Sequence, residues 1–305
     1  MPEFYVTLPT RGDGPRGDWH PDAHRPFPPF ITDPRGGNSF DHLTQLGRAA
    51  ELAGYAGALA PFDAEGEESL VVAAGLLRQT RWLRLVAEFH TGIATPVYAA
   101  KIAASLQRFS GSRLDWRLAV DLDPALARAQ GDFHEGADRY ARAEEFLTVA
   151  KGVWYEPGYT FAGRFYEVLA GGFQPPLSGS AFPRVHLSGT SRRALELSAR
   201  HADVHVFERD DDLEGAIDRL PGVEYALRLP VLAREDVDEA WHAAVRLGGF
   251  EGLVGSYESV ADDIRSFQDR GVTTFFLEAA PYLEETYRLG EHLLPLLAKE
   301  DVHAG

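Results

Sequence analysis

The feature that most constrains the fold is the alternation of short apolar runs with longer amphipathic stretches along the whole chain. Short apolar runs bounded by turn residues are typical of buried strands, and apolar residues at spacings of three and four indicate helices. Eight β-then-α units predict an α/β fold, a single closed (β/α)8 barrel of the TIM type. An open doubly wound sheet is the alternative, but no Gly-x-Gly-x-x-Gly turn follows the first strand. The predicted strands are Phe4–Leu8, Gly57–Ala60, Arg84–Ala87, Leu114–Ala119, Arg184–Leu187, Val204–Phe207, Tyr225–Val231 and Thr274–Leu277.

Three helices are clear from their periodicity, over Pro96–Phe109, Asp138–Trp154 and Leu283–Leu297. Two irregular stretches interrupt the alternation, one after the first strand and one before the fifth. Insertions this long usually cover a site in a compact domain, so the first is expected over the barrel mouth. These insertions are Arg11–Ser39 and Glu156–Ala181, the second with a hairpin around Thr160–Tyr166. We expect one domain spanning residues 1–305.

Composition narrows the possible functions. The net charge of −16 disfavours a nucleic-acid binder, because binding a phosphate backbone requires a basic surface. The chain lacks the basic amphipathic stretch of a peripheral membrane protein and any apolar run long enough for a membrane span. It contains no cysteine, which excludes disulfides, thiolate metal sites and a cysteine nucleophile. The N-terminus does not resemble a signal peptide, so a cytoplasmic location is expected.

Catalytic groups of a barrel lie at the carboxyl ends of its strands, so position alone identifies candidates. Arg228 is a cation in an otherwise apolar strand and requires an ion-pair partner or a ligand. A metal site built from His90, His186 and His205 with nearby carboxylates is conceivable, but their spacing matches no known ligand pattern, and we predict no metal. The catalytic candidates are Arg228, His90, Asp121 and Glu278, and other charged residues at the mouth include Glu88 and Glu208.

The segment Ser188-Gly-Thr-Ser191 ends the fifth predicted strand and leads directly into a helix. A small hydroxyl-rich turn at a helix N-terminus presents free N–H groups and the positive end of the helix dipole, which suits a phosphate. An ordinary helix cap is the alternative, because Ser and Thr are favoured there in any case.

Taken in order, several segments resemble the bacterial-luciferase-like flavin-dependent monooxygenases, specifically the alkanesulfonate monooxygenase branch. The likeness extends over nearly the whole chain, and the ordered set is more specific than any single motif. The segments are Leu8-Pro-Thr-Arg-Gly-Asp-Gly14, Ala49–Gly57, Leu85-Val-Ala87, Thr95-Pro with Phe109-Ser-Gly111, Asp138-Arg-Tyr140 with Glu145-Phe146, Leu187–Ser191, Leu227-Arg-Leu229, Leu253-Val-Gly255 and Pro281–Arg288.

The resemblance implies a TIM-type barrel, usually dimeric, that uses FMN reduced by a partner flavin reductase to activate molecular oxygen and oxidise a small-molecule substrate. It implies that Gly189, Thr190 and Ser191, helped by Tyr140, bind the FMN phosphate. Arg228 matches the family's active-site arginine. Coenzyme F420 is an alternative cofactor, since it also occurs in this superfamily.

This chain departs from the family pattern at the mouth. The connection that in the family closes over the flavin is reduced to Arg246–Gly252, and several family site residues are replaced. An anionic reduced flavin near several carboxylates is unfavourable unless they are protonated or paired. The replaced positions are Pro230 for a histidine, Gly66 for a cysteine, Ala280 for a tyrosine, Val120-Asp121 for Thr-Gly and Phe207-Glu208-Arg209 for a tryptophan region.

Three functions stay open on these grounds. The first is a reduced-FMN monooxygenase acting in specialised metabolism. The second is a flavin-independent enzyme that uses the mouth carboxylates and His90 for acid–base chemistry, with a cationic or amine substrate. The third is a non-catalytic subunit that dimerises with an active homologue, which the short Arg246–Gly252 connection would fit.

Overall fold

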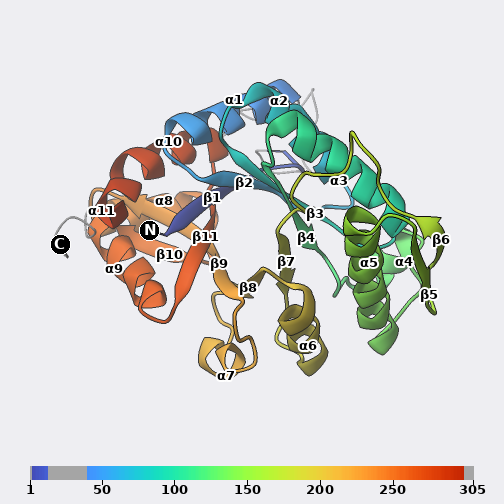
Figure 1. Ribbon diagram of the computed structural model, residues 1–305. Coiled ribbons are helices and arrows are strands. Elements are labelled where there is room, and N and C mark those ends of the chain that lie inside the picture. The colour runs from blue at the N-terminus through green and yellow to red at the C-terminus, as the bar shows by residue number, and fades with distance from the viewer. Residues whose placement is uncertain (1, 13–39, 299–305) are drawn as a thin grey trace, which may run out of the picture.

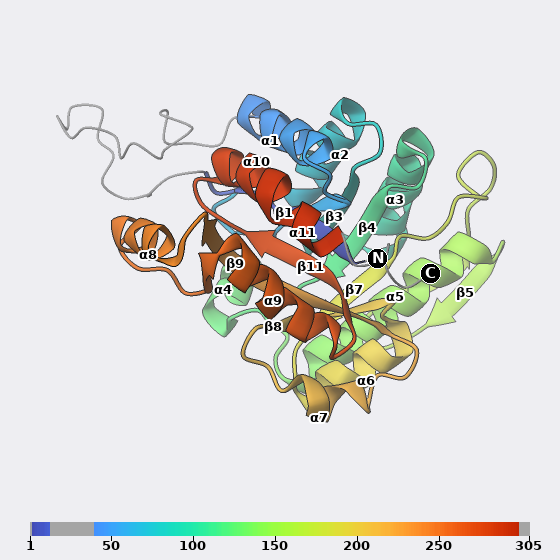
Figure 2. The same cartoon turned by 90° about the vertical axis from the view of Figure 1, so that its left-hand side faces the viewer.

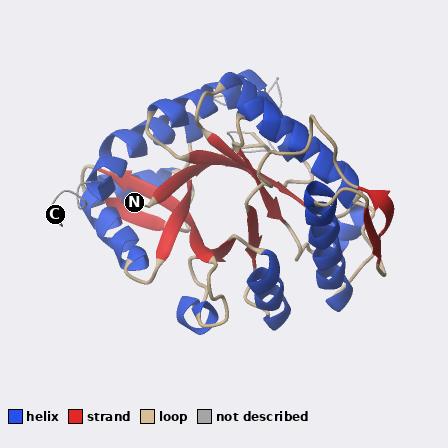
Figure 3. Ribbon diagram, viewed as in Figure 1, coloured by secondary structure: helices blue, strands red, loops and turns tan. Residues whose placement is uncertain are grey.

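The computed structural model describes residues 2–12 and 40–298. Eight strands pair in parallel and close into a ring, with β8 hydrogen-bonded to β9, so the predicted (β/α)8 barrel is confirmed. Figure 3 shows this ring of strands inside a shell of helices. The barrel strands are β1 (Glu3–Thr7), β2 (Gly57–Ala60), β3 (Arg84–Phe89), β4 (Leu114–Leu118), β7 (Val185–Ser188), β8 (Val204–Glu208), β9 (Glu224–Arg234) and β11 (Val272–Glu278).

The helices cover the outside of the ring and bury its outer face (Figure 1). Helix α3 carries the expected sequence signals at both ends. Thr95 caps its N-terminus, Pro96 occupies its first turn, and Gly111 ends it at a φ of 71°. The helices are α1 (Phe40–Leu52), α2 (Ser69–Gln79), α3 (Pro96–Ser110), α4 (Pro124–Ala129), α5 (Ala137–Tyr155), α6 (Arg192–His201), α7 (Leu213–Ile217), α8 (Val237–Arg246), α9 (Tyr257–Gln268), α10 (Tyr282–His292) and α11 (Leu294–Ala298).

Side-chain alternation divides each barrel strand between the helix-facing core and the barrel interior. In β4, Leu114, Trp116 and Leu118 belong to the outer core, where Trp116 meets the ring of Phe89 edge-on at 5.2 Å between centroids. The intervening Asp115 and Arg117 are buried on the opposite side of the strand. An apolar layer fills the middle of the barrel and consists of Tyr5, Leu59, Val86, Val204, Val206, Ala226 and Phe276.

Three local features refine the sequence predictions. The helix expected over Leu283–Leu297 is two helices, because Pro295 lacks an N–H and cannot continue α10. Strand β9 runs past Val231 to Arg234, where it pairs with an additional strand, β10 (Leu253–Ser256), which the sequence analysis did not predict. Figure 2 shows β9 from the side, with α8 projecting from the same end of the sheet.

The second insertion contains the predicted hairpin, formed by β5 (Tyr159–Ala162) and β6 (Glu167–Gly171), outside the ring beside α5 (Figure 1). The first insertion, Arg11–Ser39, lies almost wholly outside the described residues. Within the described part of the chain, no helix is both long and apolar enough to cross a membrane.

Candidate functional site

The carboxyl ends of the barrel strands carry charged residues that are largely paired with one another. Arg117 on β4 lies with its Nε 3.1 Å from Oε1 of Glu88 on the neighbouring β3. The other oxygen of Glu88 accepts a hydrogen bond of 3.1 Å from the backbone N–H of Phe62. Since both side chains are mostly buried, this pair neutralises one of the mouth carboxylates.

Arg228 and Glu278, predicted separately, lie on adjacent strands and form an ion pair. Arg228 Nη2 donates to Oε2 of Glu278 at 2.9 Å, and Nη1 lies 3.8 Å from Oε1 of Glu208 on β8. Burial alone lowers the pKa of Arg228, but Glu278 and Glu208 outweigh it and hold the pKa above its usual value. The guanidinium therefore stays charged between two carboxylates.

Arg228 separates two hollows in the mouth. One, of about 530 Å³, is lined by Thr10, Phe62, Asp63, Glu278 and Tyr282 among others. The other, of about 610 Å³, is lined by Glu208, Arg209, Pro230, Phe250 and neighbouring residues. A molecule in either hollow would contact the Arg228 side chain, which makes it the central polar group of this part of the mouth.

His90 lies apart from these ion pairs. Its ring packs edge-on against Phe62 at 5.2 Å, and its Nδ1 accepts a hydrogen bond of 3.2 Å from the N–H of Gly92. Burial lowers its pKa against the opposing effect of Asp132. The ring is therefore neutral near pH 7 and can accept a proton there.

The other two histidines considered for a metal lie elsewhere, and the described residues bring no three metal-ligating side chains together. His186 is buried within the barrel, with its Nε2 3.9 Å from Asp115. His205 lies with its Nδ1 2.8 Å from the Ser198 hydroxyl. Each histidine thus has a local environment of its own.

Asp121, Tyr140 and Ser191 form a second polar cluster, at the rim between β4 and β7. The hydroxyl of Tyr140 on α5 donates to Oδ2 of Asp121 and lies 3.0 Å from Oγ of Ser191. Burial, and next the hydrogen bond to Asp121, raise the pKa of Tyr140 to about 12. The tyrosine therefore keeps its proton and acts as a hydrogen-bond donor at any working pH.

Ser191 is the N-cap of α6, accepting from the N–H of Ala194 at 3.2 Å. Gly189 adopts a φ of 103°, a conformation that favours glycine, where the chain turns from β7 into the helix. Beside this turn lies a hollow of about 370 Å³ lined by Ser191, Arg192, Arg193 and Glu196. The ordinary cap and the anion site considered for this segment are therefore compatible.

These observations bear on whether the residues fit FMN. A helix N-terminus, two arginines and two hydroxyls are suitable for a phosphate, and the ion pairs of Glu88, Glu208 and Glu278 remove most of the expected conflict with an anionic ring. Asp121 is the exception, because its carboxylate has no cationic partner among the ion pairs of the described residues and accepts a hydrogen bond from the Tyr140 hydroxyl. The donor set fits the cofactor, with one opposing charge at its phosphate end.

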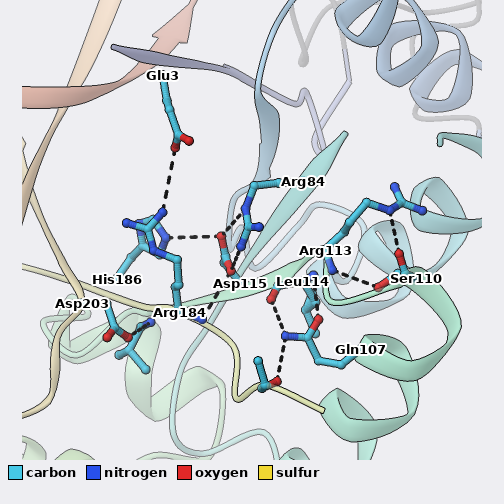
Figure 4. A network of polar contacts seen from close by, with 12 residues as sticks. Glu3, Arg84, Gln107, Ser110, Arg113, Leu114, Asp115, Arg184, His186 and Asp203 are labelled. Carbon is cyan, nitrogen blue, oxygen red and sulfur yellow. Dashed lines mark hydrogen bonds and ion pairs between the residues drawn. The ribbon is translucent and has the colours of Figure 1, made fainter. Parts of the chain in front are cut away.

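A further buried network lies at the opposite, amino end of the barrel (Figure 4). Arg84 donates twice to Asp115, from Nη2 at 2.6 Å and from Nε at 3.2 Å, and Figure 4 shows His186 and Arg184 beside this pair. The sequence analysis missed the network. The available signal was the segment Leu114-Asp-Trp-Arg-Leu118, in which two charges alternate with apolar residues inside a buried strand.

Comparison with solved structures places the fold among flavin and F420 enzymes. A riboflavin lyase, solved with modified FMN and riboflavin, superposes with a TM-score of 0.81 at 16% identity, covering 99% of this chain and 92% of that one. The EDTA monooxygenase of Chelativorans sp. BNC1 gives 0.77 at 16% identity, covering 99% and 95%. A coenzyme F420-dependent tetrahydromethanopterin reductase from Methanopyrus kandleri gives 0.75 at 12% identity, covering 97% and 99%. At these identities the likeness shows the fold alone.

The sequence itself carries the family assignment. Residues 26–253 match the family model described as luciferase-like monooxygenase, a span that includes six of the eight barrel strands and excludes β1 and β11. The match covers most of the chain and supports the expectation of a flavin-type monooxygenase enzyme. This chain belongs to the luciferase-like monooxygenase family.

Proposed function

We propose that this protein is a monooxygenase that uses reduced FMN and molecular oxygen to oxidise a small organic substrate. The observation that carries the proposal is the pairing of mouth carboxylates with Arg117 and Arg228 in a chain of this family. The pairing lowers the electrostatic cost of holding an electron-rich ring at the mouth. FMN, when bound in reduced form, would supply the electrons that activate oxygen.

The chain's own residues have distinct tasks in this proposal. Tyr140, Gly189, Thr190 and Ser191 surround the phosphate at the start of α6, where the N–H groups and the helix dipole favour an anion. Arg228 presents its positive charge to whatever occupies the two hollows on either side of it. His90, with its ring neutral near pH 7, is able to accept a proton released in the reaction.

Finer assignments belong to the same proposal. The order of the family segments favours the alkanesulfonate branch, whereas Pro230, Gly66 and Ala280 argue against a sulfonate substrate. The proposal includes a partner flavin reductase and a homodimer, which the resemblance implies, together with a cytoplasmic location and a role in specialised metabolism. Coenzyme F420 is the alternative cofactor.

The direct test is anaerobic titration of the purified chain with oxidised and reduced FMN and with F420, followed by oxygen consumption in the presence of a flavin reductase. We expect a dissociation constant for reduced FMN in the micromolar range or tighter. Arg164→Gln serves as the control, since Arg164 pairs with Asp138 on the surface and lines none of the three hollows described above. The proposal would be refuted if oxidised FMN, reduced FMN and F420 all failed to bind.

The short connection Arg246–Gly252 favours a second candidate, a non-catalytic subunit of an active homologue. It runs from the end of α8 to β10, and Phe250, Glu251 and Gly252 line the hollow beside Glu208 and Arg209. Reductase-coupled substrate oxidation by the purified chain alone would exclude this candidate. A bell-shaped pH profile of turnover without flavin would instead support the flavin-independent alternative.

A further inference from the structure

The carboxylate of Asp121 lies within the segment that would hold the cofactor phosphate. It accepts a hydrogen bond from the Tyr140 hydroxyl, which in turn lies 3.0 Å from the Ser191 hydroxyl. A Cβ built on Gly189 would lie 3.4 Å from the same Asp121 oxygen. Of the four residues assigned to the phosphate, Asp121 therefore binds Tyr140 directly, lies beside Gly189 and is linked to Ser191 through Tyr140.

The hydrogen bonds of this cluster leave no hydroxyl hydrogen available to a phosphate. Tyrosine and serine hydroxyls each carry one hydrogen, and a carboxylate carries none. Because Tyr140 donates to Asp121, the contact between Tyr140 and Ser191 must use the Ser191 hydrogen. Both hydroxyl hydrogens are thus committed to a chain that ends on a negative charge. A phosphate would find neither one free and would meet that charge as well.

The remaining donors are the first N–H groups of α6 and the arginines beside it. Arg192 is engaged with Glu196 at 2.7 Å, and Glu196 lines the same hollow. Arg193 lines it too, and its charge acts on both Glu196 and Tyr140. The terminal hydroxyl of a flavin that lacks the phosphate could instead donate to Asp121 and join the existing chain of hydrogen bonds.

We propose that Asp121 sets the cofactor selectivity of this barrel, weakening the binding of flavins that carry the phosphate so that riboflavin binds with an affinity comparable to that of FMN. The inference rests on the proposed flavin site and assigns to one residue of that site a specificity role. Asp121 acts by engaging the donors, and its effect is confined to the phosphate end of the ligand.

The test compares FMN with riboflavin by flavin-fluorescence titration of the full chain. For the wild type we expect dissociation constants within about tenfold of each other. Asp121→Asn keeps the side-chain size, removes the charge and adds an amide donor. It should tighten FMN binding by about tenfold to hundredfold, equivalent to about 1.4 to 2.8 kcal/mol, and change riboflavin binding less than about twofold.

Asp138→Asn is the matched control. It makes the same change of charge on α5 two residues from Tyr140, but its carboxylate is held by Arg164 at 2.7 Å. It should leave the ratio of FMN to riboflavin affinity unchanged. Equal effects of the two substitutions on that ratio would reduce the Asp121 effect to general electrostatics and overturn the inference.

Tyr140→Phe is a third variant, which keeps the inference testable if one of the other variants fails to fold. In the wild type it should cost little FMN affinity, because the hydroxyl is already engaged, whereas in the Asp121→Asn background it should cost about tenfold. Additive effects of the two substitutions would overturn the inference. If the wild type and all variants bind neither flavin, the proposed function itself fails, whereas flavin binding with an unchanged ratio in Asp121→Asn refutes only the role of Asp121.

Discussion

Replacing Asp115 with asparagine should destabilise the barrel far more than replacing an exposed aspartate of equal charge. The Asp115 side chain is fully buried and accepts two hydrogen bonds from Arg84, whose own side chain is 29% exposed. Its Oδ1 also accepts from the backbone N–H of Arg184 at 3.3 Å. Asparagine retains the shape, but it leaves a guanidinium without its counter-charge at the amino end of the barrel.

The magnitude follows from the burial of the pair. Removing one partner of a buried ion pair costs about 3–5 kcal/mol. Since Arg84 keeps part of its contact with solvent and asparagine still accepts one hydrogen bond, we expect a loss of about 2–4 kcal/mol in the free energy of unfolding. Asp262, paired with Arg265 at 2.6 Å but 75% exposed, provides the control. Its replacement by asparagine should cost less than about 1 kcal/mol.

Urea denaturation followed by tryptophan fluorescence measures both losses, and its pH dependence provides a second check. Burial raises the pKa of Asp115, but His186 and Arg84 outweigh it and lower the pKa in the folded state. A lowered pKa contributes stability above the unfolded-state value of about 3.9, and this contribution disappears as pH falls through the folded-state pKa. The gap between wild type and Asp115→Asn should be constant from about pH 8 to 5 and narrow below about pH 4. A loss no larger than that of Asp262→Asn at pH 7 would refute the reasoning.

Three further predictions concern the barrel interior and the mouth. Gly57→Ala should lower the melting temperature and reduce the free energy of unfolding by about 1–3 kcal/mol. The new Cβ would lie 2.2 Å from the Tyr5 ring and 2.7 Å from the carbonyl of Arg84. An unchanged melting temperature would contradict this prediction. The pKa of His90, measured by proton NMR, should lie below 6.5 because of burial, and a midpoint above 6.5 would show that the ring is not buried as described. Arg228→Gln should weaken the binding of reduced FMN by about tenfold, measured by anaerobic titration, because Glu278 and Glu208 lose their counter-charge; unaltered affinity would remove Arg228 from the flavin site.

The barrel could be predicted from sequence because its determinants are local. Each strand is a short apolar run, and each connection has turn and capping residues, such as Thr95 with Pro96 at the start of α3. The break between α10 and α11 was also local, since Pro295 cannot continue a helix, and the apolar pattern of Leu283–Leu297 obscured it. Strand β10 was harder to predict, because four residues with a central glycine become a strand only beside the extended end of β9.

The site could be predicted only as a set of positions. Arg228 and Glu278 were each placed at the mouth by strand position, but their ion pair depends on β9 lying next to β11, a register that no local pattern encodes. The Tyr140, Asp121 and Ser191 cluster joins segments that are 19 and 51 residues apart. His90 was likewise placed by strand position, and its contact with Phe62, whose backbone N–H donates to Glu88, depends on the neighbouring strand.

The distribution of charge at the mouth determines which part of the cofactor the carboxylates would repel. Four carboxylates at strand ends suggested that the whole mouth opposes an anionic flavin. In the described structure Glu88 is paired with Arg117, and Glu278 and Glu208 share Arg228, so two cations offset three carboxylates around the barrel axis. Asp121 alone among the four has no ion pair within the described residues, and its partner is the Tyr140 hydroxyl. The repulsion due to Asp121 therefore falls on the phosphate end of the ligand, where a single substitution can measure it separately from ring binding.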